Sequence, residues 1–287
     1  YSKFKHFLNE NTKKQSKNNI KYHYDLGNNF YNKWLDRSMT YSSAYFEKEN
    51  QDLFDAQLNK YKKISEALNL NENSKVLEIG CGWGGFSSYA AKNFKSQIDA
   101  ITISKAQYEY ASKKIQKEGL SEKVSIKFKD YRDIEKKYSN IASIEMFEAV
   151  GKRYWESYFN IVKNSLTSSG KAALQIITID EKRSFNYQNH PDFIQQYIFP
   201  GGMLPTKNEL NIITEKVGLD FQEIKSFGLS YAKTLNLWNN EFQNSWQDLV
   251  KLGFNDRFKR MWEFYLSYCE TGFISRSTDV SHFLINK

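Results

Sequence analysis

The stretch Val76–Gly85, with the sequence VLEIGCGWGG, constrains the fold of this chain more than any other. Residues 75–79 are mostly aliphatic and β-branched, as expected of a short buried strand. Four of the next six residues are glycines, and residues 86–93 then have a helical pattern. A strand that passes through glycines into a helix lets backbone approach a ligand at the helix N-terminus. Dinucleotide-binding folds and simple tight turns also show spaced glycines, so the neighbouring segments must decide the ligand.

Those segments favour S-adenosylmethionine (SAM) over a dinucleotide. Glu78 lies two residues before the first glycine, where a carboxylate suits an ammonium group and would repel a pyrophosphate. The next predicted strand, Gln97–Thr102, continues into Ile103 and Ser104. It lacks the acidic residue that a dinucleotide fold places about 20 residues further on. The sequence therefore predicts an α/β fold, with the Rossmann-like sheet of a class I SAM methyltransferase.

Length and charge limit the size and the partners of the protein. With 287 residues, of which 40% are hydrophobic, the chain is long enough for one large α/β domain with insertions. Its net charge of +8 favours an anionic partner, which would be a phospholipid surface, a nucleic acid or an acidic small molecule. Lys and Asn are enriched along the whole chain, and a general compositional bias explains the charge equally well.

The spacing of the cysteines and the length of the apolar runs indicate the cellular compartment of the protein. Cys81 and Cys269 give neither a disulfide framework nor a metal-ligand spacing, which fits a reducing cytoplasm and predicts no metal site. No apolar run approaches the roughly 20 residues that span a bilayer. The chain begins at Tyr1 and not at a methionine, which leaves a preceding segment open.

The first part of the chain, residues 1–70, is predicted to form a helical N-terminal cap over the active site, and residues 71–287 the methyltransferase domain. Residues 1–24 are basic and fit either a membrane-surface helix or a solvated lead-in helix. Aromatic, Gly, Asn and Asp residues are dense from 23 to 46, as expected of a segment that covers a pocket mouth. A helix is predicted over Asp52–Leu68.

Beyond the glycine turn, strands and helices continue to alternate. The predicted strand Ile141–Glu148 carries Glu145 and Glu148 at its carboxyl end. Ligands of open α/β sheets bind outside the carboxyl ends of the strands, so a carboxylate there is a candidate base or cation stabiliser. The predicted strand Lys171–Ile179 holds Gln175 in an otherwise apolar run. Such a buried Gln is more often satisfied by backbone than catalytic.

The alternation breaks over residues 180–272, and substrate-binding insertions are predicted at about 180–210 and 231–272. A helix is expected from Asp192 to a Pro/Gly loop. Two later helices carry aromatic residues at helical spacing, which indicates either ordinary core packing or the lining of a long apolar tunnel. Ser281–Ile285 is expected to be the last strand of a mostly parallel sheet and to run antiparallel to it.

Together these segments resemble the cyclopropane-fatty-acyl-phospholipid synthase family, which includes the mycolic-acid cyclopropane synthases, over nearly the whole chain. The matching stretches are His23–Gly27, Tyr41–Tyr45, Val76–Gly85, Thr102–Ser104 with Gln107, Asp130–Asp133, Met146–Glu148, Tyr197–Gly201, Leu204–Pro205, Phe227–Gly228 with Tyr231, and Arg260–Trp262.

The resemblance implies SAM-dependent conversion of a cis double bond, in an unsaturated fatty-acyl chain of a phospholipid, into a cyclopropane. It implies a bacterial, cytoplasmic enzyme that associates peripherally with the inner face of the membrane and does not bind nucleic acid. A homodimer remains open.

The resemblance also implies roles for individual residues. SAM would contact Tyr41, Ser42, Gly80, Gly82, Thr102, Gln107 and Tyr131, in addition to Glu78 at the strand end. Glu148 and Tyr231 would line the reaction centre as catalytic residues. In the family a bicarbonate ion, held by Cys, Glu, His and Tyr side chains, removes the proton whose loss closes the ring.

This sequence departs from the family at that centre. Ser43 stands where Cys is usual, Gln175 where the bicarbonate-binding His is usual, and Ala149 where a His commonly follows Glu148. Glu145 adds a carboxylate. Because Ser and Gln still hydrogen-bond an anion, both count as candidate catalytic residues, and bicarbonate stays open as a second cofactor.

Two products therefore remain open. Plant members with the same Gln and Ala make cyclopropanes, whereas some bacterial relatives leave a methyl branch on an unsaturated chain. A small-amine N-methyltransferase is a weaker alternative, because the similar plant enzymes typically keep the His that Ala149 replaces. A nucleic-acid methyltransferase is suggested only by the charge.

Overall fold

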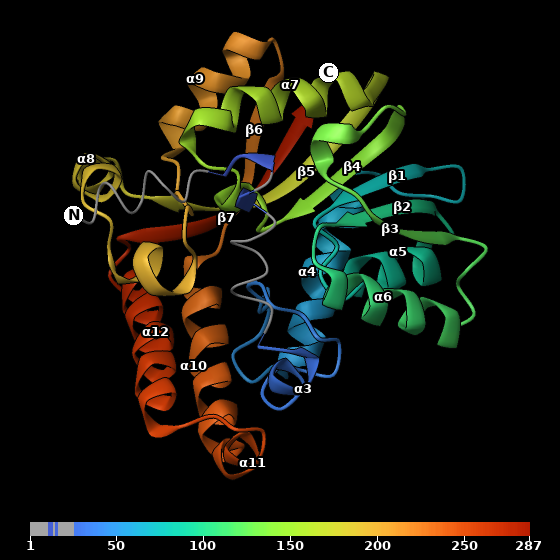
Figure 1. Ribbon diagram of the computed structural model, residues 1–287. Helices are drawn as coiled ribbons and strands as arrows, with labels where there is room; N and C mark the ends of the chain where they lie inside the picture. Colours follow the sequence, from blue (N-terminus) through green and yellow to red (C-terminus); the bar gives the residue numbers. More distant parts are fainter. Residues whose placement is uncertain (1–10, 14, 17–25) are drawn as a thin grey trace.

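The computed structural model describes residues 11–13, 15–16 and 26–287. Within them a seven-stranded sheet is flanked by helices, in the strand order β3-β2-β1-β4-β5-β7-β6 (Figure 1). All strands run parallel except β7, which pairs antiparallel with both β5 and β6. The predicted fold class, with its antiparallel last strand, is confirmed. Most of the predicted helix of residues 1–24 and most of the 23–27 motif lie outside the described residues.

The strands are β1 (Lys75–Ile79), β2 (Gln97–Thr102), β3 (Val124–Phe128), β4 (Tyr138–Ile144), β5 (Leu166–Ile179), β6 (Asp220–Ser226) and β7 (Thr278–Asn286). Central strands such as β1 and β4 are largely buried on both faces, as expected of the inner strands of a mostly parallel sheet. The edge strand β6 is largely exposed and carries charged residues, which discourages pairing with another chain.

Helices cover both faces of the sheet. One face packs against α4 (Leu53–Ala67), α5 (Gly85–Phe94) and α6 (Lys105–Lys117), and its core includes Tyr61, Phe86 and Ala100. The other face packs against α7 (Trp155–Ser165) and α9 (Lys207–Val217), with Phe159, Leu210 and Phe283 in the core. Apolar positions on each helix therefore point at the sheet, as the helical spacing of α4 predicted.

A separate aromatic core lies between the N-terminal segment and three later helices, and these helices stand below the sheet in Figure 1. These are α10 (Gly228–Asn244), α11 (Trp246–Lys251) and α12 (Asp256–Ile274), and the N-terminal segment contributes α3 (Asn28–Tyr31). The ring of Phe30 lies 5.1 Å from that of Trp262, and Trp34 lies 5.8 Å from Trp238. The cap is thus fixed to the insertion by aromatic packing.

Three predictions were wrong at the level of single elements. The strand predicted to run through Glu148 ends at Ile144, and residues 147–149 form the short 3-10 helix η2 (Phe147–Ala149), preceded by a positive φ at Glu145. The helix expected from Asp192 is the π-helical turn η4 (Ile194–Ile198). Two helices, α8 (Glu181–Asn189) and α9, were not predicted, although Thr206 and Glu209 form a capping box that the sequence displays.

Candidate active site

A cavity of about 1450 Å³ lies at the carboxyl ends of β1, β2 and β4. This is the edge at which open α/β sheets bind ligands. The residues predicted to contact SAM all line it: Tyr41, Ser42, Glu78, Gly80, Gly82, Thr102, Gln107 and Tyr131. Both predicted insertions also contribute to its wall, so one cavity joins the cofactor side to the insertion side.

The glycine turn brings backbone to the floor of the cavity. Gly80 has φ +82°, and a Cβ there would lie 2.7 Å from Cγ of Met146. The N–H groups of Gly80 and Cys81 both donate to the carbonyl of Ile101 at 3.0 Å, which holds the turn against β2. No larger side chain fits at Gly80 without moving the neighbouring segment.

Glu78 is the second-last residue of the buried strand β1 and lines the cavity. Its carboxylate accepts a hydrogen bond from the hydroxyl of Ser87 in α5. Burial raises the pKa of Glu78 to about 7, and the Ser87 hydrogen bond opposes that shift. A cationic ammonium group beside it would favour the charged form, so Glu78 fits the amino-acid part of SAM.

Polar groups at the end of β2 are fixed by one another. The hydroxyl of Thr102 donates to Oε1 of Gln107 at 3.0 Å, and Ser104 caps α6 by accepting from the N–H of Gln107. Asp130 in turn pairs with Arg132 at 2.8 Å beside Tyr131. The cofactor side thus combines a glycine turn, a carboxylate and polar side chains that are fixed by hydrogen bonds. These groups fit SAM.

Lys60 is a site residue that the sequence reasoning missed. It is fully buried in α4, and its Nζ donates to Oγ of Ser42 at 2.5 Å. Burial lowers the pKa of Lys60, while the carboxylates of Glu145, Asp36 and Glu78 oppose that shift. Its position three residues after Gln57 on the buried face of α4 was a signal that could have revealed it.

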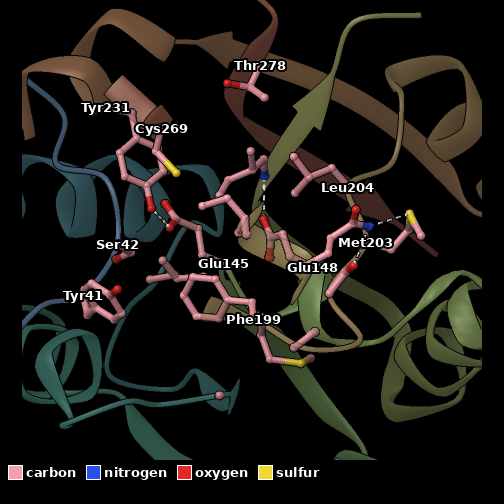
Figure 2. A pocket seen from close by; sticks show the side chains of 18 of the residues that line it. Tyr41, Ser42, Glu145, Glu148, Phe199, Met203, Leu204, Tyr231, Cys269 and Thr278 are labelled. Atoms are coloured by element: carbon pink, nitrogen blue, oxygen red, sulfur yellow. Dashed lines mark hydrogen bonds between the residues drawn. The ribbon is translucent and has the colours of Figure 1, made fainter. Parts of the chain in front are cut away.

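The reaction centre is built around the carboxylate of Glu145 (Figure 2). Its Oε1 accepts from the backbone N–H of Ser43 at 2.8 Å and from Nε2 of Gln175 at 2.6 Å. Its Oε2 accepts from the hydroxyl of Tyr231 at 2.6 Å. The structure therefore brings three of the predicted catalytic residues, Ser43, Gln175 and Tyr231, to one carboxylate.

Two of these residues act differently from the prediction. The hydroxyl of Ser43 donates to the carbonyl of Ala44 at 2.9 Å, so Ser43 reaches the centre through its backbone and not through its side chain. Gln175 contacts two side chains and one backbone group, since its Oε1 lies 2.9 Å from Nε2 of His282 and its Nε2 also donates to the carbonyl of Ser43 at 3.4 Å. Both predictions missed these contacts because the partners lie far away in sequence.

Glu148, the predicted catalytic carboxyl, lies on the neighbouring wall of the cavity in Figure 2. Its Oε1 accepts from the N–H of Ile177 at 2.6 Å, and its buried Oε2 has no hydrogen-bond partner among the described residues. Burial, and then the charge of Glu145, raise the pKa of Glu148 to about 8. At neutral pH Glu148 is therefore mainly the uncharged acid.

Beside charged residues such as Lys182 and Arg183, the insertion side of the cavity has an extended apolar wall. It is lined by Ile179, Tyr187, Ile194, Phe199, Met203, Leu204, Leu235, Phe264, Tyr265, Cys269 and Phe273. In the two aromatic helices, Tyr231 and Leu235 line the cavity, whereas Trp238 and Phe242 are core residues. In α12, Tyr265 and Cys269 likewise line the cavity, whereas Trp262 is a core residue outside its lining.

The fold and the cavity together define a class I SAM methyltransferase. The chain belongs to the mycolic acid cyclopropane synthetase family, whose model matches residues 11–283. The family resemblance seen in the sequence is thereby confirmed.

Two relatives carry names that refer to different lipid products. The chain is 36% identical over 279 residues to the tuberculostearic acid methyltransferase UfaA1 of Mycobacterium tuberculosis, covering 94% of this chain and 65% of the relative. It is 37% identical over 256 residues to the cyclopropane-fatty-acyl-phospholipid synthase of Escherichia coli, covering 89% and 64%. The chain thus spans slightly less than two thirds of the length of either relative.

Solved structures agree on the fold. The crystal structure of mycolic acid cyclopropane synthase CmaA1 complexed with SAH and CTAB is 26% identical, with a TM-score of 0.87, and covers 94% of this chain and 98% of that one. In the part of the chain that the structure describes, no helix is long and apolar enough to cross a membrane.

Proposed function

We propose that this protein transfers a methyl group from SAM to the cis double bond of an unsaturated phospholipid acyl chain and closes a cyclopropane ring. The observation that carries the proposal is a single cavity whose polar cofactor side and apolar insertion side meet at a buried carboxylate. When bound, SAM supplies an electrophilic methyl group.

The residues of the chain supply what such a reaction needs. An unactivated alkene is a weak nucleophile, so it must be held in line in a pocket that excludes water. Phe199, Leu204 and Phe273 offer an apolar wall for the acyl chain. The carboxylate of Glu145 stabilises the positive charge that methylation leaves on that chain.

The product is tested with SAM that carries a trideuterated methyl group and with vesicles of cis-monounsaturated phospholipid. A cyclopropane forms only when one hydrogen leaves the added methyl, so we expect a fatty acid that keeps two of the three deuterium atoms. Mass spectrometry of the released fatty acids reads this directly. A product that keeps all three would instead make the protein a fatty-acyl C-methyltransferase, the activity that the name of UfaA1 favours.

We further propose that the protein docks on a phospholipid surface at the mouth of the cavity. An aromatic row of Tyr197, Phe193, Phe264 and Tyr268 runs from η4 to α12, with centroid distances of 5.3, 4.7 and 5.8 Å. Tyr197 is 50% and Phe264 is 51% exposed. The exposed Lys182 and Arg183 of α8 line the same cavity, so cationic groups for lipid phosphates lie near its opening.

Replacing both Tyr197 and Phe264 by Ser should weaken binding to anionic phospholipid vesicles about 10-fold, because two apolar rings no longer enter the interface. Vesicle co-sedimentation measures this. The matched control is Ile212→Ser on α9, which is 55% exposed and lies outside the cavity lining. Equal vesicle affinities of the double variant and the control would refute the docking surface.

A further inference from the structure

We infer that Glu145 is the base of this reaction, and that its carboxylate takes the place that the family resemblance assigns to bicarbonate. The inference rests on the proposed function and deepens it. It makes the proton acceptor a permanent part of the chain, held by the groups that would otherwise bind the free ion.

The hydrogen bonds around Glu145 carry the argument. The resemblance assigns the anion to the positions of Ser43, Gln175, Tyr231 and Glu148. In the structure the first three direct their donors at the two oxygens of Glu145, at 2.6 to 2.8 Å. A carboxylate and a bicarbonate share the same planar pair of oxygens, so one satisfies donors arranged for the other.

The backbone at Glu145 is held in an unusual conformation that serves this purpose. Its φ is +50°, in the left-handed region, which costs a non-glycine residue about 1–2 kcal/mol. The N–H of Glu145 donates to the carbonyl of Gln175 at 2.9 Å, so pairing with β5 holds the residue in place. Strain of this kind is retained where the surrounding structure over-determines it, as at active sites.

His282 fixes the orientation of Gln175. It is buried on β7, and burial lowers its pKa to about 3, so the ring is neutral. Its Nε2 lies 2.9 Å from Oε1 of Gln175 and is therefore the protonated nitrogen. With its Oε1 accepting from His282, Gln175 must present its Nε2 to Glu145.

The two buried carboxyls, Glu145 and Glu148, have different surroundings and therefore different protonation states. Burial raises the pKa of Glu145, but the cation of Lys60 and the three hydrogen bonds that the carboxylate receives oppose that rise. Glu148 receives one from the backbone, and its pKa is raised. Two neighbouring carboxyls in unequal environments take unequal protonation states, so Glu145 is the anion and Glu148 the acid.

A bicarbonate ion does not fit this arrangement. The donors it would need are already engaged, and a second anion against Glu145 would meet like-charge repulsion in a buried site. The sequence left open whether Ser43 and Gln175 hold bicarbonate, and our inference assigns their contacts to Glu145 instead.

The proton step balances on the acyl chain and Glu145. Once the methyl group is bonded to one alkene carbon, the other carbon carries the positive charge. One C–H bond of the new methyl breaks, its electron pair forms the third bond of the ring, and the proton goes to Oε1 or Oε2 of Glu145. The chain becomes neutral and Glu145 becomes a carboxylic acid.

The test compares the wild type with Glu145→Gln and Glu145→Gly in buffer freed of carbon dioxide, with and without added bicarbonate. We expect the wild type to be equally active in both. Glu145→Gln keeps the shape but not the basicity, and should lose activity about 100-fold or more under both conditions. Glu145→Gly relaxes the positive φ and opens the anion site, so bicarbonate should restore its activity in part.

Two outcomes would overturn the inference: a wild type that needs added bicarbonate, or a Glu145→Gln variant that remains fully active. SAM affinity, measured by calorimetry on each variant, should be unchanged, which separates loss of the base from misfolding. If the wild type labels no lipid, the proposed function fails. The inference about Glu145 is then tested by binding of ¹³C-bicarbonate, followed by NMR. Binding to Glu145→Gly and not to the wild type supports the inference, and binding to both, or to neither, refutes it.

Discussion

Replacing Lys60 by Met should lower the free energy of unfolding by about 1–3 kcal/mol, because it leaves the buried hydroxyl of Ser42 without its donor and removes the positive charge that opposes the raised pKa of Glu145. Thermal or urea unfolding measures this. Loss of the positive charge also raises the pKa of Glu145, so less of it is ionised at neutral pH. Product formation should fall about 10-fold at pH 7 and recover as the pH rises.

The control is Lys63→Met on the same helix. Lys63 forms a surface ion pair with Glu47 at 2.9 Å, and removing such a pair changes stability by about 0–1 kcal/mol. The double variant Lys60→Met with Glu145→Gln should regain part of the lost stability, since no unpaired charge remains. If the two substitutions were additive, Lys60 would have no electrostatic link to Glu145.

Replacing Gly80 by Ala should weaken SAM binding about 30-fold, which corresponds to about 2 kcal/mol. The added Cβ would lie 2.7 Å from Cγ of Met146, at a φ of +82° that an L side chain rarely adopts. The turn must then shift away from the position in which its backbone lines the cavity. Isothermal titration calorimetry with SAM reads the effect directly.

Gly119→Ala is the matched control for that change. Gly119 also has a positive φ, of +67°, but a Cβ added there would have no atom within 4 Å, and the residue lies outside the cavity lining. The substitution should cost about 1 kcal/mol of stability and leave SAM affinity unchanged. An equal loss of affinity in both variants would show that Gly80 acts through stability alone.

The sequence predicted what depends on local pattern. Val76–Gly85 indicates its strand, turn and helix within ten residues, and its spacing alone placed Glu78 and Gly80 at the ligand edge of the sheet. The order of the alternating elements similarly predicted the parallel sheet, because connections in such folds are short and of one hand.

The rest depends on contacts between distant residues. Glu145 is 102 residues from Ser43 and 86 from Tyr231, and nothing local shows that its side chain receives both hydrogen bonds. Its positive φ is imposed by the pairing with β5, against the preference of a non-glycine residue. The charge state of Glu148 likewise depends on burial and on a neighbour, which a spacing pattern does not encode.

A base that is a side chain of the protein must lose its proton again within the active site. Free bicarbonate can carry its proton away by diffusion, whereas Glu145 must pass its proton on before the next turnover. Tyr231, whose hydroxyl donates a hydrogen bond to Oε2, is the hydroxyl group in direct contact with the carboxylate and a first step for such a route. Deprotonation of the enzyme thereby becomes a separate step of the catalytic cycle, and a solvent deuterium isotope effect on turnover would report its share of the rate.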